Sequence, residues 1–336
     1  MTEEQSQLKA LLSKPQKIVI IIHRNPDGDA VGSGTALKVF LMQMGHEVSL
    51  ISPNEIPEYL KWMPFTKDIL LFDENKEQTE KILNSVELIF TLDFNDLSRT
   101  GREMEKMLHE LEEKTYIMID HHLEPSNYAK YMFSDHHKSS TSEMVYEFIT
   151  TLSDKSAITK SMATCLYTGI MTDTGSFKFP NTTANTMRIA ADLMAKGIKH
   201  NKIQIKIYDS FTTDKLHLLG EALNKLIFLP EYKTAYIALS KANLDKHNYQ
   251  KGDTDNLANQ ALSIKGMKAA IVFTERDGIM KISFRSKGEE NPVNVLAGEH
   301  FDGGGHANAS GGMSELTVAE TLDKIKGLVP QYFSAL

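Results

Sequence analysis

Apolar runs typical of buried strands alternate with helical patterns in the first half of this 336-residue chain. The strand-like runs are KIVIII (17–22), EVSLIS (47–52), ELIFTLDF (87–94) and KTYIMID (114–120). A helix between two strands is long enough to bring the second strand back in the direction of the first, so such units form parallel pairs. The alternation therefore predicts an α/β fold, with a mostly parallel sheet flanked by helices.

The rest of the chain predicts a second, smaller domain. Three further helical patterns complete the first domain, and they span 140–152, 157–171 and 182–197. We place this first domain at residues 1–199, and we expect residues 200–229 to form a helical connector. Residues 230–336 mix strand-like runs with helical patterns, which predicts a mixed α/β domain. Two domains also suit the length of the chain, which is long for a single core.

Charge and hydropathy narrow the classes of partner. The net charge is −7, and Lys and Arg are scattered along the chain, so we expect no binding of long duplex nucleic acid and only short nucleic-acid partners. The N-terminal residues lack the apolar core of a signal peptide, and no segment reaches the length of a membrane span. We therefore expect a cytoplasmic protein without a membrane partner, and its oligomeric state, a homodimer included, stays open.

Acidic residues and histidines stand at the ends of three strand-like runs. They are His23, Asp27 and Asp29 after the first run, Asp93 in the third, and Asp120, His121 and His122 at the end of the fourth. Because the carboxyl ends of parallel strands share one edge of the sheet, these side chains should converge. Asp173, in the segment YTGIMTDTGSF, is a further candidate. Crowded carboxylates repel one another unless cations neutralise them, so the pattern predicts a metal site.

We expect this site to hold two divalent cations that share Asp93. The predicted ligands are His23, Asp27 and Asp93 for one ion, and Asp29, Asp93, His121 and Asp173 for the other. Oxygen-rich sites with imidazole and no thiolate favour Mn²⁺ over structural zinc, with Mg²⁺ or Co²⁺ as alternatives. Two such ions about 3.5 to 4 Å apart can activate a water molecule for in-line phosphoryl displacement.

Each part of this pattern also has a purely structural explanation. The tripeptide Asp27-Gly28-Asp29 could be a polar turn in which glycine serves turn geometry, and the adjacent His121 and His122 could be a hydrogen-bonded core pair. The hypothesis of a metal site therefore depends on their combination. A second Asp-His-His sequence, at 135–137, follows a poorer strand, and we expect it to be an exposed loop.

The segment GGGHANASGG (303–312) is unusually rich in glycine. It lacks the Lys-Ser/Thr ending of a P-loop and the spacing of a dinucleotide-binding motif. Consecutive glycines let backbone N–H groups approach an anion closely, and His306 and Arg285 could add contacts to phosphate. The alternative is a flexible loop with a solvent-facing arginine.

Taken together, these segments resemble the DHH phosphoesterase superfamily, and within it the NrnA-like oligoribonucleases that also act on 3′-phosphoadenosine 5′-phosphate (pAp). The motifs that carry the resemblance are NPDGDAVGS (25–33), LDFNDLSRTG (92–101), IDHH (119–122), YTGIMTDTGSFKF (167–179), and FRSKG (284–288) with GGGHANASGG. The last two resemble the DHH-associated substrate domain. The resemblance thus extends over nearly the whole chain.

The resemblance implies a usually manganese-dependent enzyme with two metal ions, bound by the ligands named above. It places His122 at the scissile phosphate and gives Asp120 and Asp93 supporting catalytic roles. The substrate-binding residues that it implies are Arg99, Arg285, Gly303, Gly304, Gly305, His306 and Ser310. We expect an activated water to attack phosphorus while His122 and the metal ions stabilise the added negative charge.

The implied substrates are short oligoribonucleotides, hydrolysed to 5′-mononucleotides, and pAp, hydrolysed to AMP. One alternative is a phosphodiesterase of cyclic or linear dinucleotides on the same fold. An exopolyphosphatase or pyrophosphatase is a second alternative, and a non-catalytic nucleotide-binding regulator with a structural metal is a third.

Overall fold

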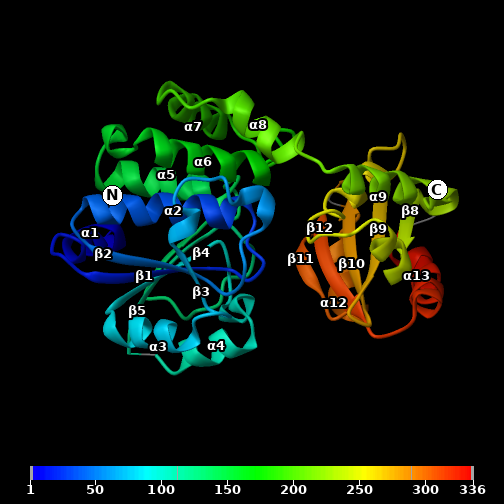
Figure 1. Ribbon diagram of the computed structural model, residues 1–336, viewed down its shortest axis with the longest axis horizontal. Coiled ribbons are helices and arrows are strands. Elements are labelled where there is room, and N and C mark those ends of the chain that lie inside the picture. Colours follow the sequence, from blue (N-terminus) through cyan, green and yellow to red (C-terminus); the bar gives the residue numbers. More distant parts are fainter. Residues whose placement is uncertain (1–2, 112, 289, 334–336) are drawn as a thin grey trace. The chain divides into compact units, whose positions relative to one another are not determined.

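The computed structural model describes residues 3–111, 113–288 and 290–333. The chain divides into two compact units, Met1–Ser210 and Phe211–Leu336, and each contains one six-stranded sheet (Figure 1). The segment 200–229 contributes α8 (His200–Tyr208) to the first unit, and α9 (Thr213–Asn224) and β7 (Ile227–Leu229) to the second.

The sheet of the first unit is entirely parallel, with the strand order β3-β2-β1-β4-β5-β6. Its strands are β1 (Lys17–Ile22), β2 (Glu47–Ser52), β3 (Ile69–Leu71), β4 (Leu88–Leu92), β5 (Thr115–Asp120) and β6 (Tyr131–Ser134). Strands β1 and β4 are mostly apolar and almost wholly buried, as expected for a parallel sheet with both faces covered. Ile22 of β1 pairs with Leu92 of β4, so the two strands end side by side. The predicted α/β fold is confirmed.

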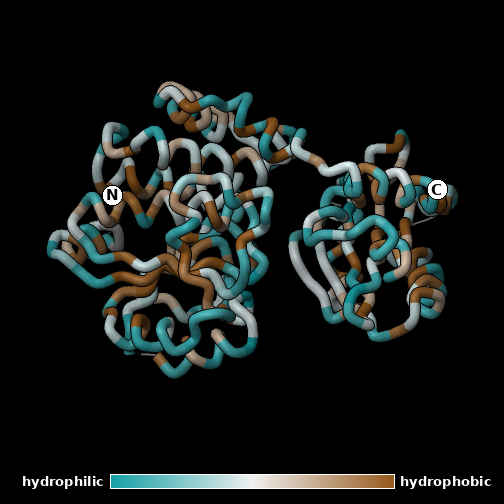
Figure 2. The backbone as a smooth tube through the Cα atoms, in the orientation of Figure 1, coloured by the Kyte–Doolittle hydropathy of each residue, from teal (hydrophilic) through white to brown (hydrophobic). Residues whose placement is uncertain are grey.

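Helices cover both faces of this sheet (Figure 1). They are α1 (Glu3–Leu11), α2 (Gly28–Gln43), α3 (Lys76–Ser85), α4 (Arg102–His109), α5 (Thr141–Leu152), α6 (Lys160–Asp173), α7 (Ala184–Ala195) and α8. One apolar core joins the sheet to α2, α5 and α6, and a second joins its other face to α3 and α4. The α7 and α8 helices form a layer outside α6. In Figure 2, the strands of this sheet are mainly hydrophobic, and the segments around them contain more hydrophilic residues.

Helix α2 packs very closely against α6 because glycines face the contact. A Cβ atom on Gly32 would lie 2.5 Å from the carbonyl oxygen of Cys165, and one on Gly28 would lie 2.4 Å from Oγ1 of Thr172. Both glycines lie within α2 rather than in a turn, so their role is helix packing. The close approach brings the start of α2 against the end of α6, where Asp173 lies.

The second unit contains a mixed sheet with the strand order β11-β12-β10-β9-β8-β7. Besides β7, its strands are β8 (Thr234–Leu239), β9 (Ala269–Arg276), β10 (Ile279–Ser286), β11 (Gly304–His306) and β12 (Ala309–Ser314). The pair β8 and β9 is parallel, and the other pairs are antiparallel. This confirms the predicted smaller, mixed α/β region.

Helices also pack on both faces of the second sheet. They are α9, α10 (Lys241–Lys246), α11 (Leu257–Leu262), α12 (Val293–His300) and α13 (Val318–Tyr332). One core is formed with α12 and α13, and another, on the opposite face, with α9, α10 and α11. Within the described ranges, no helix of either unit has the length and apolar character needed to cross a lipid bilayer.

Candidate active site

Two aspartates lie at the start of α2, immediately after β1. Asp27 is the N-cap residue, and its Oδ1 accepts hydrogen bonds from the backbone N–H groups of Asp29 (2.9 Å) and Ala30 (3.1 Å). This capping satisfies N–H groups that have no partner inside the helix. Asp29 lies in the first turn and is fully buried, whereas the side chain of Asp27 is half exposed. The short sequence thus directs one carboxylate inward and leaves the other at the surface.

Asp93 follows β4 and is buried at the centre of the cluster. Its Oδ2 lies 3.5 Å from Nε2 of His23, and its Oδ1 lies 3.5 Å from Nε2 of His121. The backbone of Asp93 has a φ of 66°, in the left-handed region that non-glycine residues seldom adopt and that is common at functional sites. The strained backbone turns one carboxylate toward two histidines from different strands.

Further side chains enter the cluster from β5 and α6. Nε2 of His121 lies 3.3 Å from Oδ2 of Asp173, the last residue of α6. Nδ1 of His122 lies 2.6 Å from Oδ1 of the buried Asp120. The other oxygen of Asp120 has no hydrogen-bond partner among the described residues. The short contact between His122 and Asp120 fixes the orientation of the imidazole ring.

The arrangement of these side chains fits divalent cations. The groups whose donor atoms all lie within 4.8 Å of one another include His23 with Asp27 and Asp93, Asp29 with His121 and Asp173, and Asp93 with Asp120 and His122. The first two groups contain all six side chains that the sequence proposes as ligands. Neighbouring donors of an octahedral ion with bonds of about 2.1 Å are roughly 3 Å apart and opposite donors roughly 4.2 Å. The distances of 3.3 to 4.0 Å from His23 and His121 to carboxylate oxygens fit that range.

The pKa values of His23 and Asp173 are consistent with a site that binds positive charge. Burial lowers the pKa of His23, but its hydrogen bond with Asp93 and the charges of Asp27 and Asp93 outweigh this effect and raise the pKa to about 9. Burial also raises the pKa of Asp173 to about 7, against the opposing effect of the His121 charge. Protons therefore neutralise this cluster when no cation does.

Residues at the start of α5 hold two of these carboxylates, and the sequence did not indicate this role. At the start of α5, the backbone N–H groups of Thr141 and Ser142 donate to Oδ2 (2.6 Å) and Oδ1 (2.8 Å) of Asp29. The hydroxyl of Thr141 donates to Oδ1 of Asp93 at 3.0 Å. Helix N-termini present unpaired N–H groups that bind anions. The Ser-Thr-Ser sequence was a signal for a helix start, but it did not reveal which carboxylates the helix binds.

Glu143 fixes the segment that leads into α5. This buried carboxylate accepts hydrogen bonds from the Ser139 hydroxyl, from Oγ1 of Thr186 (2.8 Å) and from Nδ2 of Asn185 (2.9 Å). Thr186 and Asn185 belong to α7. These donors thus satisfy Glu143, and no basic side chain of the described residues forms an ion pair with it. The contacts connect α7 to the start of α5 and, through Thr141, to Asp93.

Arg99 lies on the same edge of the first sheet, a few residues after Asp93. It is an exposed residue of the 3₁₀ helix Leu97–Thr100, which Asp96 caps by accepting from the Ser98 N–H at 3.0 Å. The carbonyl oxygen of Arg99 accepts from the backbone N–H of Arg24 at 2.8 Å. This bond holds the Arg99 segment against the segment that follows β1.

The second Asp-His-His sequence lies outside the cluster. His136 and His137 are exposed in a turn after β6, as expected.

In the second unit, Arg285 and His306 lie in one row across three strands. Ala309 of β12 pairs with Arg285 of β10 on one side and with His306 of β11 on the other. Directly opposed residues of antiparallel strands point to the same face, so the small Ala309 separates the two polar side chains. Ser310 points to the opposite face, where it is buried and donates to the carbonyl oxygen of His306 at 2.8 Å.

The glycine-rich segment forms a hairpin rather than an irregular loop. Strands β11 and β12 are joined by the turn Ala307-Asn308. A Cβ on Gly303 would lie 2.1 Å from the carbonyl oxygen of Gly311, and one on Gly305 would lie 2.7 Å from that of Ala309. The close pairing of the strands therefore requires glycine at positions 303 and 305. A Cβ atom on Gly304, in contrast, would meet no atom within 4 Å.

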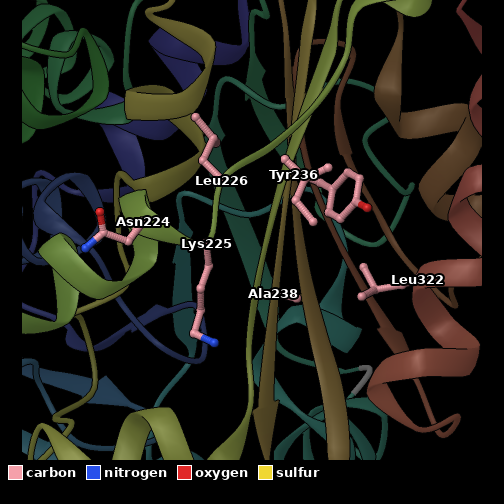
Figure 3. Close-up of a pocket in the computed structure, with 7 residues that line it drawn as sticks. Asn224, Lys225, Leu226, Tyr236, Ala238 and Leu322 are labelled. Atoms are coloured by element: carbon pink, nitrogen blue, oxygen red, sulfur yellow. The ribbon is translucent and has the colours of Figure 1, made fainter.

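A separate pocket of about 300 Å³ lies in the second unit (Figure 3). It is lined by Asn224, Lys225, Leu226, Ile227, Tyr236, Ala238 and Leu322. The residues come from the end of α9, from β7 and β8, and from α13. None of them is among the residues that the sequence proposes for metal or phosphate binding.

The chain is similar to known proteins over most of its own length. The chain is 28% identical over 299 residues to the bifunctional oligoribonuclease and PAP phosphatase NrnA of Thermus thermophilus, covering 88% of this chain and 83% of that protein. It is 25% identical to the cyclic-di-AMP phosphodiesterase GdpP of Bacillus subtilis, covering 97% of this chain but spanning about half (49%) of that relative. A crystal structure of an exopolyphosphatase-related protein from Bacteroides fragilis matches with a TM-score of 0.94 and 37% identity, covering 99% of this chain and 98% of that one.

Two family models match the chain in order. Residues 17–170 match the DHH family N-terminal domain, and residues 231–335 match the DHHA1 domain. The first match contains nearly all of the carboxylate and histidine cluster, and the second contains Arg285 and the glycine-rich hairpin. This protein therefore belongs to the DHH family, with a DHH domain followed by a DHHA1 domain.

Proposed function

We propose that this protein is a metal-dependent phosphoesterase that hydrolyses short oligoribonucleotides to 5′-mononucleotides and pAp to AMP. The observation that supports this most strongly is the position of Asp93, which has one oxygen 3.5 Å from His23 and the other 3.5 Å from His121. One carboxylate that faces two groups of donors is suited to bridge two cations. The similarity to the NrnA protein of Thermus thermophilus, which extends over most of both chains, supports the substrate class.

In this proposal, six side chains hold two divalent cations, for which Mn²⁺ is the first choice. The ligands are His23, Asp27, Asp29, Asp93, His121 and Asp173. When bound, the cations would lower the pKa of a coordinated water and neutralise charge on the phosphate. The carboxylate and imidazole donors suit manganese or magnesium better than a closed structural zinc site, because no thiolate is present in the cluster.

His122 is proposed to act on the phosphate directly. Its Nδ1 is fixed by Asp120, so the ring is oriented to present its other nitrogen to a substrate oxygen. A donor positioned in advance stabilises the charge that develops in the transition state without reorganisation. Asp120 would keep the ring in this orientation through its short hydrogen bond.

Basic side chains and backbone N–H groups outside the cluster are proposed to bind further phosphates or the terminal nucleotide. They are Arg99 in the first unit, and Arg285, His306 and the backbone of Gly303, Gly304 and Gly305 in the second. Arginine suits this role because its planar group makes two hydrogen bonds to a phosphate. Ser310 would act only indirectly, through its bond to the carbonyl oxygen of His306.

Product analysis by chromatography tests the proposal. The manganese-loaded protein is incubated separately with a short oligoribonucleotide, pAp, cyclic di-AMP and inorganic polyphosphate, with Asp93→Asn as the inactive control. We expect 5′-mononucleotides from the RNA and AMP from pAp, and loss of both activities in the variant. Exclusive release of phosphate from polyphosphate would contradict the proposal.

Cyclic dinucleotide hydrolysis is the second candidate. The match to GdpP of Bacillus subtilis extends over 97% of this chain, so the whole two-domain unit has a counterpart in a cyclic-di-AMP phosphodiesterase. A strong preference for cyclic di-AMP in the same experiment would favour this candidate over the first.

A further inference from the structure

The turn that follows Asp173 has an unusual backbone. Three consecutive residues, Gly175, Ser176 and Phe177, have φ values of 55°, 63° and 66°. The left-handed region is unfavourable for residues with a side chain, above all for a bulky one. Such conformations persist only where the surrounding structure enforces them, and they cluster at ligand-binding sites. This turn begins two residues after a proposed metal ligand.

Hydrogen bonds hold the turn in place at several points. The N–H of Ser176 donates to the carbonyl oxygen of Met171 at 2.7 Å, and the N–H of Phe179 donates to that of Thr174 at 3.0 Å. The hydroxyl of Ser176 also accepts from Nε2 of Gln204 in α8 at 2.8 Å. The turn is therefore a fixed feature of the first unit.

The two phenylalanines of the turn have different environments. Phe177 is partly buried, belongs to the edge of the main apolar core and lies 5.8 Å from the ring of Tyr167. Phe179 remains 38% exposed, although its ring is packed against Gly175. A Cβ on Gly175 would lie 2.6 to 2.8 Å from three ring atoms of Phe179. Phe177 thus stabilises the core, whereas Phe179 presents an aromatic surface to solvent.

The exposed ring is close to the metal cluster. Two residues of chain span at most about 7 Å, so the Cα atom of Gly175 lies within that distance of the Cα atom of Asp173. The contact with Gly175 then places the ring of Phe179 within roughly 11 Å of the same atom. In a nucleotide, a single sugar separates the base from the phosphate, so one nucleotide can extend across such a distance.

We propose that Phe179 stacks on a nucleobase of the substrate, in the nucleotide whose phosphate lies at the Asp93 cluster. The inference rests on the proposed function and adds a determinant of substrate class to it. An aromatic ring that is held rigidly and partly exposed binds any base through its π-face without reading its identity. Phe179 therefore favours nucleotides over inorganic phosphates.

The test compares ligands with and without a base. Equilibrium binding of AMP and of ribose 5-phosphate is measured by calorimetry on the full-length, manganese-loaded protein, for the wild type, Phe179→Ala and Phe179→Trp. Stacking of one base corresponds to a factor of about 5 to 150 in the dissociation constant. We expect Phe179→Ala to weaken AMP binding by this factor and to leave ribose 5-phosphate unchanged, whereas Phe179→Trp retains AMP binding.

Phe177→Ala is the matched control. It should lower the melting temperature because Phe177 packs in the core, whereas Phe179→Ala should leave the melting temperature nearly unchanged. Equal effects of Phe179→Ala on both ligands, or no effect on AMP, would overturn the proposal. Since binding is measured without turnover, this result is independent of hydrolysis, and absence of hydrolysis in the wild type would refute the proposed function instead.

Discussion

Thr141 donates its hydroxyl hydrogen to Oδ1 of Asp93 over 3.0 Å, although the two residues are 48 positions apart in the sequence. The backbone N–H of the same threonine donates to Asp29 at 2.6 Å. One residue at the start of α5 therefore orients carboxylates from two other elements, the end of β4 and the start of α2. Partners of this kind fix the geometry of metal ligands and influence metal affinity.

Replacement of Thr141 by valine keeps the shape of the side chain and removes its hydroxyl. We expect Thr141→Val to weaken Mn²⁺ binding about 10- to 100-fold and to lower the free energy of unfolding by only about 1 kcal/mol. The matched control is Thr150→Val in the same helix, where the hydroxyl bonds only to backbone carbonyl oxygens. Equal metal affinity in the two variants, measured by calorimetry, would refute the role of Thr141.

Two helical glycines should respond in opposite directions to alanine. A Cβ on Gly169 would lie 2.0 Å from the Ser142 hydroxyl oxygen and 2.8 Å from Oδ1 of Asp29, whereas one on Gly220 would meet no atom within 4 Å. Overpacking should lower the free energy of unfolding of Gly169→Ala by about 1 to 3 kcal/mol. Gly220→Ala should raise it by about 0.5 to 1 kcal/mol. Denaturant titration measures both changes, and a stable Gly169→Ala variant would contradict the close packing.

Metal binding should release protons. The pKa of His23 is raised to about 9, so at pH 7 the metal-free histidine carries a proton that it must lose to bind a cation. We therefore expect the affinity for Mn²⁺ to rise from pH 7 to pH 9, by up to about tenfold per pH unit for each proton released. Calorimetry in two buffers with different ionisation enthalpies counts these protons. The same dissociation constant at both pH values would be inconsistent with this mechanism.

Loss of Arg285 should affect substrate binding more than turnover. If its guanidinium binds a phosphate, Arg285→Ala should raise the KM for a short oligoribonucleotide about 10- to 100-fold, the range for a charged hydrogen bond, with kcat little changed. Lys326→Ala, on the surface of α13, removes an equal charge and should leave KM unchanged. Steady-state kinetics distinguish the outcomes, and equal KM values for the two variants would exclude Arg285 from the binding site.

The parallel sheet could be predicted from sequence because the apolar runs at β1, β2, β4 and β5 alternate with helical patterns along the chain. The convergence of Asp29, Asp93 and His121 followed from the same pattern, since parallel strands end at one edge. The combination of strands and helices in the second unit was also visible as strand-like runs mixed with helical patterns, whereas the directions of its strands were not predicted. The hairpin of β11 and β12 could not be distinguished from a loop in the sequence. Glycines are common in turns and loops, whereas here Gly303 and Gly305 allow the strands to pair closely.

The contacts that orient the cluster were not visible in the sequence. Thr141 and Glu143 lie in a segment whose pattern indicated only a helix, and their partners are distant in the chain or on another helix. Likewise, the sequence offered turn geometry as one explanation for Gly28 and did not indicate its role in helix packing, because the closeness of α6 is a property of tertiary packing. The hydrophobic periodicity of a helix or strand indicates which of its faces is buried. It does not indicate which polar atoms of other elements lie against that face.

The most direct test of the proposed metal centre is anomalous diffraction from crystals of the protein grown with Mn²⁺. We expect two anomalous peaks, one beside His23 and the other beside His121, each within about 2.3 Å of a carboxylate oxygen of Asp93. A single peak, or peaks that do not contact Asp93, would contradict it.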